Sequence, residues 1–327
     1  MDTKNKLRWG ILGYARIARV ELMPAILRSS NSELAAIASR GRAKLDECAK
    51  AFPDVRALVG YEKLVTDPEV DAIYIPLPNS QHSEWTIRAA EHGKHVLCEK
   101  PIAMNAAECR AMMAACAKHR VTFMEAFMYR YTDRVRQVME VLKGGALGEV
   151  KFISSSFRFL LQDPNSFKLA PELGGGSLYD VGCYPINFIG MVADFIGAGP
   201  ATAVPESVAV ECVMKGGVDH IFSAVLKYPS GLIATLSSGF NAHGRVFTEI
   251  VGTKGFLEIP DTFFGNSGQL RLTTAAGAHE IPVAESDRYR LEVEDFAAAV
   301  FEKRAPVMGL EETLRNAELI DRLLAAR

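Results

Sequence analysis

The chain has 327 residues and a formal net charge of −2, from 37 Lys and Arg against 39 Asp and Glu; 49% of its residues are hydrophobic and 23% are charged. A near-neutral chain presents no broad basic surface, which argues against nucleic acid and anionic membranes as partners. The apolar content also excludes a disordered chain, and the length fits about two domains of ~150 residues each.

The first part of the chain alternates between short apolar runs and stretches with helical spacing. The strand patterns are Leu7–Leu12, Glu33–Ala38, Val70–Ile75, His95–Cys98 and Val121–Met124. The helix patterns are Ile17–Leu27, Ala43–Ala51, Ser80–His92 and Ala106–His119. This alternation predicts βαβ units in a parallel sheet, so residues 1–124 are expected to form an α/β domain of the Rossmann class.

After residue 124 the pattern changes to successive strands framed by helices. The strand patterns are Val150–Phe159, Val208–Met214, His220–Tyr228, Leu232–Phe240, Phe247–Val251 and Phe256–Ile259. The helix patterns are Asp133–Lys143, Ser177–Ile196, Tyr289–Glu302 and Leu310–Leu324. Consecutive strands with short links predict an antiparallel sheet, so residues 125–327 are expected to form a C-terminal α+β domain.

Cysteine usage and the chain start predict a cytoplasmic protein. The six cysteines are scattered without a tight repeat, which favours thiols in a reducing compartment. Residues Met1–Lys6 lead directly into the first strand pattern, without the apolar core of a secretory signal. The most apolar window, Val181–Gly199, is interrupted by Pro185 and Asp194 and predicts no membrane span.

The first strand pattern ends in a turn similar to the glycine-rich dinucleotide fingerprint. Read against G-x-G-x-x-G, it is Gly13-x-Ala15-x-x-Ala18, with Ala at the second position as a weaker match. The glycine makes the tight turn, and the helix start offers N–H groups to a pyrophosphate. Close packing of helix on strand, without a ligand, is the alternative. The predicted pyrophosphate-binding residues are Gly13, Tyr14, Ala15, Arg16 and Ile17.

The end of the second strand pattern indicates which dinucleotide binds. NAD sites place Asp or Glu here for the ribose 2′-hydroxyl, but the segment Ala38–Lys44 has no acid. Guanidinium groups bind a 2′-phosphate, which a carboxylate would repel. NADP is therefore predicted, with NAD possible and a solvated basic helix start as the alternative. The predicted 2′-phosphate and ribose residues are Ser39, Arg40, Arg42 and Lys44.

Two further strand ends carry unusual residues. One continues into Pro76-Leu77-Pro78-Asn79 and then His82, and the other into Glu99-Lys100-Pro101. Ligands of parallel sheets bind outside the carboxyl ends of the strands, and Pro101 keeps Lys100 out of the helical region. Helix capping is the alternative role for His82, and a surface ion pair with Lys94 is the alternative for Glu99. The predicted nicotinamide-side residues are Pro76, Leu77, Pro78, Asn79, His82, Glu99 and Lys100.

These motifs occur in a fixed order together with two more, Glu125-Ala-Phe-Met-Tyr-Arg130 and Gly174-Gly-Gly-x-x-x-Asp180-x-Gly-x-Tyr184. The whole chain thereby resembles the glucose–fructose oxidoreductase/inositol dehydrogenase (Gfo/Idh/MocA) family, nearest its dihydrodiol dehydrogenases, NADP-dependent aldose dehydrogenases and sugar ketoreductases. The resemblance implies a Rossmann domain and a substrate domain with a large, mostly antiparallel sheet. It also implies an active site between the domains and a homodimer or homotetramer formed through that sheet.

Carried over to this sequence, the family pattern makes Lys100, Tyr184 and Asp180 the catalytic residues. Hydride transfer at a carbon bearing a hydroxyl needs a group that takes or gives the hydroxyl proton. Tyr184 is the expected proton carrier, because a nearby Lys100 ammonium would lower the pKa of a tyrosine from its ordinary value of about 10. Asp180 is expected to orient Lys100 or a substrate hydroxyl. The alternatives are a core aromatic for Tyr184 and an early-turn helix acid for Asp180.

Other polar residues give weaker predictions. Arg130 and Tyr289 lie at family-patterned positions that face the cofactor or the substrate. His92, His95 and Cys98 straddle a helix-to-strand turn and a buried strand, so no metal site is predicted.

The sequence therefore predicts an NADP-dependent oxidoreductase acting on a carbon of a small-molecule sugar or cyclic diol. Two alternatives stay open: a glycosidase of the same family that uses a tightly bound NAD for transient oxidation, and a non-catalytic dinucleotide-sensing regulator. Substrate identity and reaction direction are left undecided, because a one-residue slip in strand register would reverse every side chain lining the substrate side.

Overall fold

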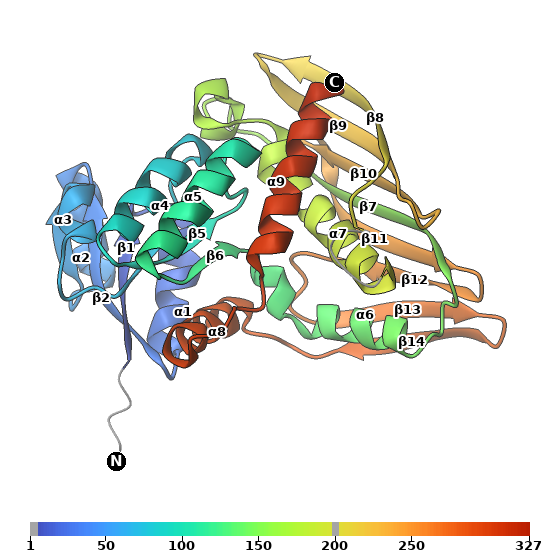
Figure 1. Cartoon of the computed structure of the whole chain (residues 1–327), viewed down its shortest axis with the longest axis horizontal. Helices are drawn as coiled ribbons and strands as arrows, with labels where there is room; N and C mark the ends of the chain where they lie inside the picture. Colours follow the sequence, from blue (N-terminus) through green and yellow to red (C-terminus); the bar gives the residue numbers. More distant parts are fainter. Residues whose placement is uncertain (1–5, 198–202) are drawn as a thin grey trace. The chain divides into compact units, whose positions relative to one another are not determined.

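The computed structural model describes residues 6–197 and 203–327. Residues 1–5, which were predicted to carry no secretory signal, and residues 198 and 199 of the apolar window Val181–Gly199 lie outside this part. The chain divides into two compact units: Met1–Met128 with Asp287–Thr313, and Tyr129–Ser286 with Leu314–Arg327. We call these unit 1 and unit 2 and describe each by itself (Figure 1).

Unit 1 is built on a parallel sheet whose described strands follow the order β3-β2-β1-β4-β5-β6. The strands are β1 (Leu7–Leu12), β2 (Ser32–Ser39), β3 (Arg56–Val59), β4 (Ala72–Ile75), β5 (His95–Glu99) and β6 (Phe123–Ala126). This is the strand order of a doubly wound dinucleotide-binding fold, which confirms the predicted Rossmann class. Short buried strands such as β4 are apolar throughout because both faces of the sheet are covered.

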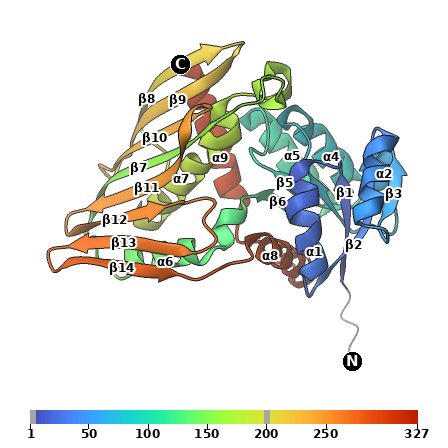
Figure 2. The same ribbon diagram turned by 180° about the vertical axis from the view of Figure 1, so that it is seen from behind.

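Helices cover both faces of this sheet. The helices of unit 1 are α1 (Met23–Arg28), α2 (Arg42–Ala51), α3 (Tyr61–Val65), α4 (His82–Glu91), α5 (Ala106–His119) and α8 (Arg288–Glu302). Helices α4 and α5 pack together on one face, and α1 and α8 pack together on the other (Figures 1 and 2). A π-helical segment (Ala18–Leu22) precedes α1, and a 3₁₀ turn (Asn79–Gln81) precedes α4.

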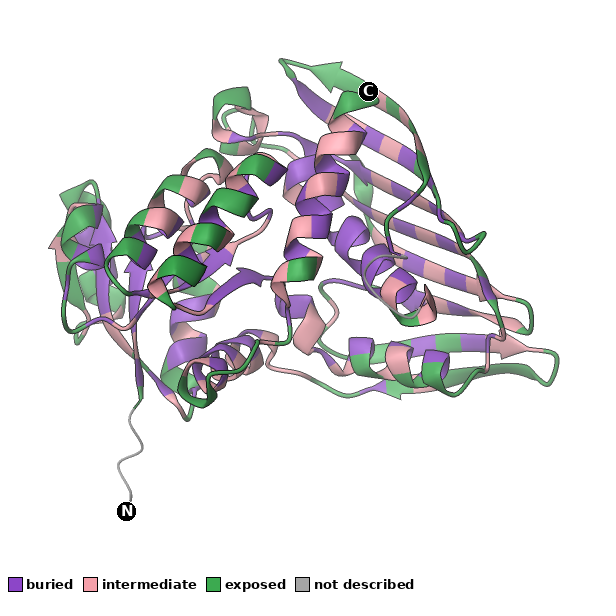
Figure 3. Ribbon diagram, in the orientation of Figure 1, coloured by how far each residue is buried: buried purple, intermediate pink, exposed green. Residues whose placement is uncertain are grey.

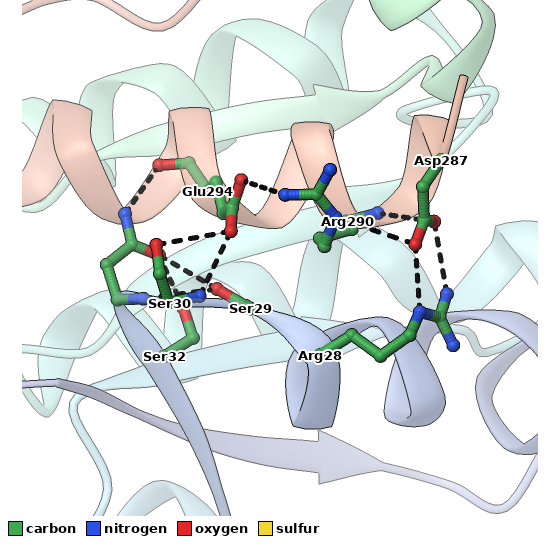
Figure 4. Close-up of polar contacts among 8 residues, drawn as sticks. Arg28, Ser29, Ser30, Ser32, Asp287, Arg290 and Glu294 are labelled. Atoms are coloured by element: carbon green, nitrogen blue, oxygen red, sulfur yellow. Dashed lines mark hydrogen bonds and ion pairs between the residues drawn. The ribbon is translucent and has the colours of Figure 1, made fainter. Parts of the chain in front are cut away.

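Helix α8 joins unit 1 although it lies far along the chain. Its Phe296 ring packs 5.1 Å from the Trp9 ring of β1, measured between centroids. Polar contacts hold its first turns against α1 and the start of β2: Arg28 binds Asp287 through Nε–Oδ2 (2.8 Å), and Ser30 N donates to Glu294 Oε1 (3.0 Å) (Figure 4). The predicted boundary assigned residues 125–327 to one domain. The structure instead returns Asp287–Thr313 to unit 1, because the apolar face of α8 is buried on the parallel sheet.

Unit 2 contains a large sheet in the order β14-β13-β12-β11-β7-β10-β9-β8 among the described strands. The strands are β7 (Val150–Leu160), β8 (Ser207–Lys215), β9 (Val218–Lys227), β10 (Ile233–Gly239), β11 (Asn241–Gly252), β12 (Gly255–Pro260), β13 (Gly268–Thr274) and β14 (Gly277–Val283). All neighbouring pairs are antiparallel except β10 and β7, which run parallel. The predicted mostly antiparallel sheet is confirmed.

One face of this sheet carries the helices of unit 2. These are α6 (Asp133–Lys143), α7 (Cys183–Gly197) and most of α9 (Leu310–Ala325), which enters unit 2 at Leu314. There are also 3₁₀ segments at Met128–Tyr131, which enters unit 2 at Tyr129, at Phe167–Leu169 and at Pro171–Leu173. A π-helical segment, Leu178–Gly182, leads into α7. Burial alternates along the strands, as Figure 3 shows, and Figure 2 shows the other face of the sheet, which no helix of the described residues covers. Arg315 of α9 forms an ion pair with Asp194 of α7.

Candidate active site

Gly13 makes the turn at the carboxyl end of β1. Its φ is 109°, and its N–H donates to Ala38 O at 2.9 Å. A Cβ at this position would lie 3.0 Å from the Leu77 side chain, so both conformation and space require glycine. The chain then enters the π-helical segment that precedes α1, with Tyr14 buried and Arg16 exposed. This turn fits the pyrophosphate of a dinucleotide, as the spacing of the predicted residues Gly13–Ile17 suggested.

The end of β2 carries an exposed basic group. Arg40, Arg42 and Lys44 are all exposed, and the first turn of α2 holds no acidic side chain. Arg42 Nε lies 3.2 Å from Asp46 Oδ1 in an exposed pair. Burial raises the pKa of Tyr61, and the neighbouring Arg40 guanidinium partly opposes this rise. The guanidinium groups therefore remain on the surface beside the helix start, where the sequence predicts a 2′-phosphate.

The turn that carries Lys100 is held from two sides by buried side chains. Lys100 is half-buried and joined to Pro101 by a cis peptide bond. His82, with none of its surface exposed, places Nδ1 3.0 Å from Pro101 O and Nε2 2.8 Å from Leu77 O. Glu125 Oε1 accepts from Ile102 N at 2.9 Å. Lys100 is thus presented by a turn whose backbone is fixed on both sides.

Two titratable groups beside Lys100 have shifted pKa values. Burial raises the pKa of Glu125 to about 8, and the Lys100 ammonium partly opposes this rise. Burial lowers the pKa of His82, although the carbonyls around the ring favour its protonated form. Both ring nitrogens of His82 face backbone carbonyls, so the ring positions the turn that carries Lys100. The direct ribose contact predicted for His82 stays a prediction.

Glu99 faces the interior of unit 1. Its Oε1 accepts from the Tyr74 hydroxyl at 2.5 Å, and its Oε2 accepts from Lys100 N at 3.3 Å. Lys94, the alternative partner, is buried and donates instead to Asp67 O (2.6 Å) and Val70 O (2.8 Å). The alternative of a surface pair between Glu99 and Lys94 is therefore wrong.

Helix α8 adds two buried groups to the same region. Tyr289 is 6% exposed, and Glu292 is 1% exposed. Burial raises the pKa of Glu292 well above its ordinary value, and the nearby Glu99 carboxylate adds to this rise. Burial, followed by Glu99, raises the pKa of Tyr74 in the same way. The motifs did not indicate Glu292, because its burial beside Glu99 depends on the return of α8 to unit 1.

In unit 2, Asp180 and Tyr184 lie on a helix whose start is held by Asp219. Asp219 is 2% exposed, and its Oδ2 accepts from Ser177 Oγ (2.7 Å) and from Leu178 N (2.8 Å). Gly176 has a φ of 120°, and a Cβ there would clash with Asp219 Oδ1. The glycine-rich motif thus serves a close approach of backbone to a buried carboxylate. A π-helical turn then carries Asp180, a type of irregularity that is frequent at functional sites.

Tyr184 is 4% exposed and lies among aromatic rings. Ring centroids of Phe157, Phe263 and Phe264 are 5.4, 5.3 and 5.8 Å from its own. The Tyr129 ring is 6.0 Å away. Tyr184 is thus held rigidly by the core, and the core role considered as an alternative is compatible with a proton-carrying hydroxyl.

Arg130 and Asp180 have partners within unit 2 that the sequence did not indicate. Arg130 Nη1 donates to Asn187 Oδ1 at 3.4 Å, and Tyr129 Oη donates to the same oxygen at 2.5 Å. Asp180 Oδ2 accepts from Lys168 Nζ at 2.6 Å. Lys168 lies in the 3₁₀ segment Phe167–Leu169, which carries no recognised motif, so only the folded chain reveals the pair.

The described ranges hold neither a metal-ligating cluster nor a membrane-spanning helix. In residues 6–197 and 203–327, no group of three or more His, Cys, Asp or Glu side chains could hold a metal ion. The ring of His95 instead accepts from Thr122 N at 2.9 Å through Nδ1. Within the same ranges, no helix is long and apolar enough to cross a membrane.

Comparison with known proteins places the chain in a family. Residues 7–127 match the model of an oxidoreductase family with an NAD-binding Rossmann fold, and residues 135–258 match the GFO/IDH/MocA C-terminal domain. The chain belongs to this Gfo/Idh/MocA oxidoreductase family and is an NAD(P)-dependent oxidoreductase, which confirms the resemblance seen in the motifs.

Several relatives match over almost the whole chain. It is 35% identical to the D-xylose 1-dehydrogenase (NADP(+)) 2 of Haloferax volcanii, over 96% of this chain and 95% of that protein. It is 30% identical to the trans-1,2-dihydrobenzene-1,2-diol dehydrogenase of Xenopus laevis, over 97% of each. A 3-ketoreductase from Actinomadura kijaniata, solved with NADP and TDP-benzene, superposes with a TM-score of 0.88 at 28% identity, over 98% of each chain.

Proposed function

We propose that this protein is an NADP-dependent oxidoreductase that transfers a hydride between the nicotinamide and a hydroxyl-bearing carbon of a sugar or cyclic diol. The observation that carries the proposal is the Lys100 turn, fixed by His82 and Glu125 at the carboxyl end of the parallel sheet. An ammonium held at the ligand-binding edge of a Rossmann sheet can bind the reacting hydroxyl. The similar xylose and dihydrodiol dehydrogenases support the substrate class.

NADP is proposed over NAD because of the charge at the end of β2. Arg40, Arg42 and Lys44 are exposed, and the helix start has no carboxylate to bind a ribose 2′-hydroxyl. A guanidinium binds a phosphate through a charge-assisted, often bidentate contact. Ser39, whose hydroxyl accepts from Gly41 N at 3.4 Å, would shape the same loop.

The remaining cofactor contacts follow the loops of unit 1. Gly13, Tyr14, Ala15, Arg16 and Ile17 would bind the pyrophosphate, and the carboxyl ends of β4 and β5 would hold the nicotinamide ribose. Arg130 and Tyr289 are proposed to line the same ligands. The residues at the carboxyl ends of β4 and β5 that are proposed to hold the nicotinamide ribose are Pro76, Leu77, Pro78, Asn79 and Glu99.

Tyr184 and Lys100 are proposed to move the proton. In the oxidative direction, Tyr184 Oη takes the proton of the substrate hydroxyl while the carbon–hydrogen bond breaks and a carbonyl forms. A bound nicotinamide would supply the hydride acceptor for this oxidation. The Lys100 ammonium favours the phenolate form of Tyr184 that takes this proton, and it stabilises the negative charge that develops on the substrate oxygen. In reduction, each step runs in reverse, and Tyr184 returns the proton to the carbonyl oxygen.

Replacement of the two proton-handling residues tests this function. We expect Tyr184→Phe and Lys100→Met each to lower kcat by about 10²- to 10⁴-fold, measured as NADPH formation with aldoses and cyclic diols. Tyr228→Phe is the matched control, because Tyr228 is 1% exposed and its hydroxyl has no hydrogen-bond partner among the described residues. Full turnover in both variants would refute the proposed roles.

We also propose a cytoplasmic homodimer or homotetramer that forms through the sheet of unit 2. The face without described helices carries small side chains, among them Ser154, Thr235, Ser237 and Ser223, around a hollow of about 340 Å³. Small side chains allow two sheets to approach closely. Light scattering of the wild type and of Val225→Glu, a change at a 44% exposed position on this face, tests the assembly. An unchanged mass in the variant would exclude this face.

A further inference from the structure

The Tyr61 side chain lies beside the turn that Gly13 makes at the carboxyl end of β1. Its hydroxyl oxygen is 3.5 Å from the position that a Cβ on Gly13 would occupy. Tyr61 is the first residue of α3, and only 9% of its surface is exposed. A buried aromatic ring thus carries its hydroxyl to the turn that is proposed to bind the pyrophosphate.

The end of β2 lies next to the same tyrosine. Gly60 N donates to Ser39 O at 3.0 Å, so the chain enters α3 against the residue that precedes Arg40. Burial raises the pKa of Tyr61, and the Arg40 guanidinium opposes this rise by its charge and by a hydrogen bond to the hydroxyl. The hydroxyl of Tyr61 therefore lies between the Gly13 turn and the first basic side chain after β2.

The Tyr61 ring is held from the side by α4. The Trp85 ring meets it edge-on, with the two centroids 5.1 Å apart and the planes at 84°. Arg88 Cζ lies 5.2 Å from the centre of the Trp85 ring, and Arg88 forms an ion pair with Glu62. The carboxylate next to Tyr61 in the chain is thereby paired with a cation of α4. A ring held in this way is preorganised, which reduces the entropy lost when a ligand binds to its hydroxyl.

The location of the hydroxyl matches one part of a dinucleotide. In a dinucleotide-binding fold, the pyrophosphate binds at the first strand-to-helix turn, and the 2′ position of the adenosine ribose lies at the end of the second strand. A group between these two points lies beside that ribose and its 2′ substituent. A tyrosine hydroxyl has one O–H donor and also accepts, so it can accept from a guanidinium while it donates to a phosphate oxygen. Hydrogen bonds to an ionised acceptor are about twice as strong as those between neutral groups.

We propose that Tyr61 binds the 2′-phosphate of NADP, with its hydroxyl accepting from the Arg40 guanidinium and donating to a phosphate oxygen. Tyr61 is then a specificity-determining residue, because it also holds the exposed Arg40 side chain in the orientation that the phosphate requires. The inference rests on the proposed NADP dependence and adds a residue that neither the glycine-rich turn nor the basic segment indicates.

Fluorescence titration of the full chain with dinucleotides tests the role of Tyr61. We expect Tyr61→Phe to bind NADP⁺ about 5- to 20-fold more weakly, as the loss of a hydrogen bond to a charged group predicts, and to bind NAD⁺ within about 2-fold of the wild type. Adenosine 2′,5′-bisphosphate and 5′-AMP, which differ only in the 2′-phosphate, should show the same selective loss. Tyr61→His, which keeps an N–H donor, retains part of the preference. Tyr228→Phe, the control in unit 2, retains all of it.

A double-mutant cycle shows whether Tyr61 acts together with Arg40. If it does, the loss of NADP⁺ affinity in the double variant Arg40→Ala/Tyr61→Phe is smaller than the product of the two single losses. An exact product, an unchanged NADP⁺ affinity in Tyr61→Phe, or equal losses for NADP⁺ and NAD⁺ would overturn the role of Tyr61 alone. A wild type that binds NAD⁺ as tightly as NADP⁺ would overturn the proposed NADP preference as well.

Discussion

Unit 1 and unit 2 position their functional side chains in different ways. In unit 1, Lys100 stands on a loop at the end of a parallel strand, and the buried side chains of His82 and Glu125 bind the backbone of that loop. In unit 2, Asp180 stands on a helix, and glycines bring the helix start against the buried Asp219. The first arrangement depends on the protonation of buried groups, whereas the second depends on backbone conformation. The two units should therefore respond differently to pH and to glycine replacement.

Glu125→Gln should change the free energy of unfolding more than any other replacement discussed, and the change should depend on pH. Burial raises the pKa of Glu125 to about 8 from an ordinary value of 4.5. Between these values the folded chain keeps a proton that the unfolded chain releases, so the wild type loses stability as pH rises through this window. The loss approaches roughly 4–5 kcal/mol above pH ~8 and is absent below pH ~4.5.

The thermal midpoints of wild type and Glu125→Gln, followed from about pH 4.5 to 9, measure this loss. We expect the variant to gain on the wild type as pH rises, since Gln cannot ionise and still accepts from Ile102 N. Glu140→Gln, at an exposed position, is the control and should follow the wild type. Parallel curves for wild type and Glu125→Gln would show that the buried carboxyl does not set the pH response of unit 1.

Gly176→Ala should give the next largest effect, in unit 2. The φ of 120° and the close Asp219 carboxylate both oppose a side chain here. We expect a destabilisation of about 2–3 kcal/mol, seen as a midpoint lowered by roughly 5–10 °C at any pH. Gly231→Ala is a matched control, because Gly231 has a φ of 82° with nothing within 4 Å, and should cost only about 1 kcal/mol. Equal effects of the two replacements would exclude the Asp219 contact as a cause.

Replacing Arg40 and Arg42 together by Ala tests cofactor choice in unit 1. We expect NADP⁺ to bind about 10- to 50-fold more weakly and NAD⁺ to bind as before, since only NADP carries the 2′-phosphate. Fluorescence titration with both dinucleotides measures the change. Lys50→Ala, on the last turn of the same helix, controls for general charge. A parallel loss for both dinucleotides would place the 2′-phosphate elsewhere.

The smallest effect is expected for the polar contacts of α8 with α1. Arg28→Ala removes the pair with Asp287, in which Arg28 remains 52% exposed. Exposed ion pairs contribute about 0–1 kcal/mol, so the midpoint should fall by no more than ~4 °C. Phe296→Ala, which removes the buried contact with Trp9, should cost several times more. The reverse order would mean that the polar contacts, rather than the apolar ones, join α8 to unit 1.

The sequence predicted unit 1 more completely than unit 2. Strands such as β1 and β4 are continuous apolar runs, and the rule that ligands bind at their carboxyl ends selected Gly13, Arg40 and Lys100 as candidate ligand-binding residues. The short edge strand β3 was missed because its side chains are mostly exposed and follow no apolar pattern. The β13–β14 hairpin was also missed: β14 is mostly exposed, and β13 buries only Leu270 and Leu272.

Contacts between segments distant in the chain could not be predicted. Such segments are joined by three sets of contacts: the side chains that fix the Lys100 turn, the ion pair of Lys168 with Asp180, and the hydrogen bonds of Asp219 to the helix start. The return of α8 to unit 1 is of the same kind. Periodicity reports which face of an element is buried, but it does not report the element against which that face packs.

Transfer of carbon-bound deuterium tests the central claim of hydride transfer most directly. The full chain is incubated with NADP⁺ and either D-xylose deuterated at C1 or trans-cyclohexane-1,2-diol deuterated at both carbinol carbons, and the recovered cofactor is analysed by mass spectrometry. We predict one deuterium in the nicotinamide ring of each NADPH formed. The oxidised product should have lost the deuterium of the carbon that became the carbonyl. A cofactor without deuterium would contradict the proposed hydride transfer, and deuterium that returns to the sugar carbon would indicate a transient oxidation instead.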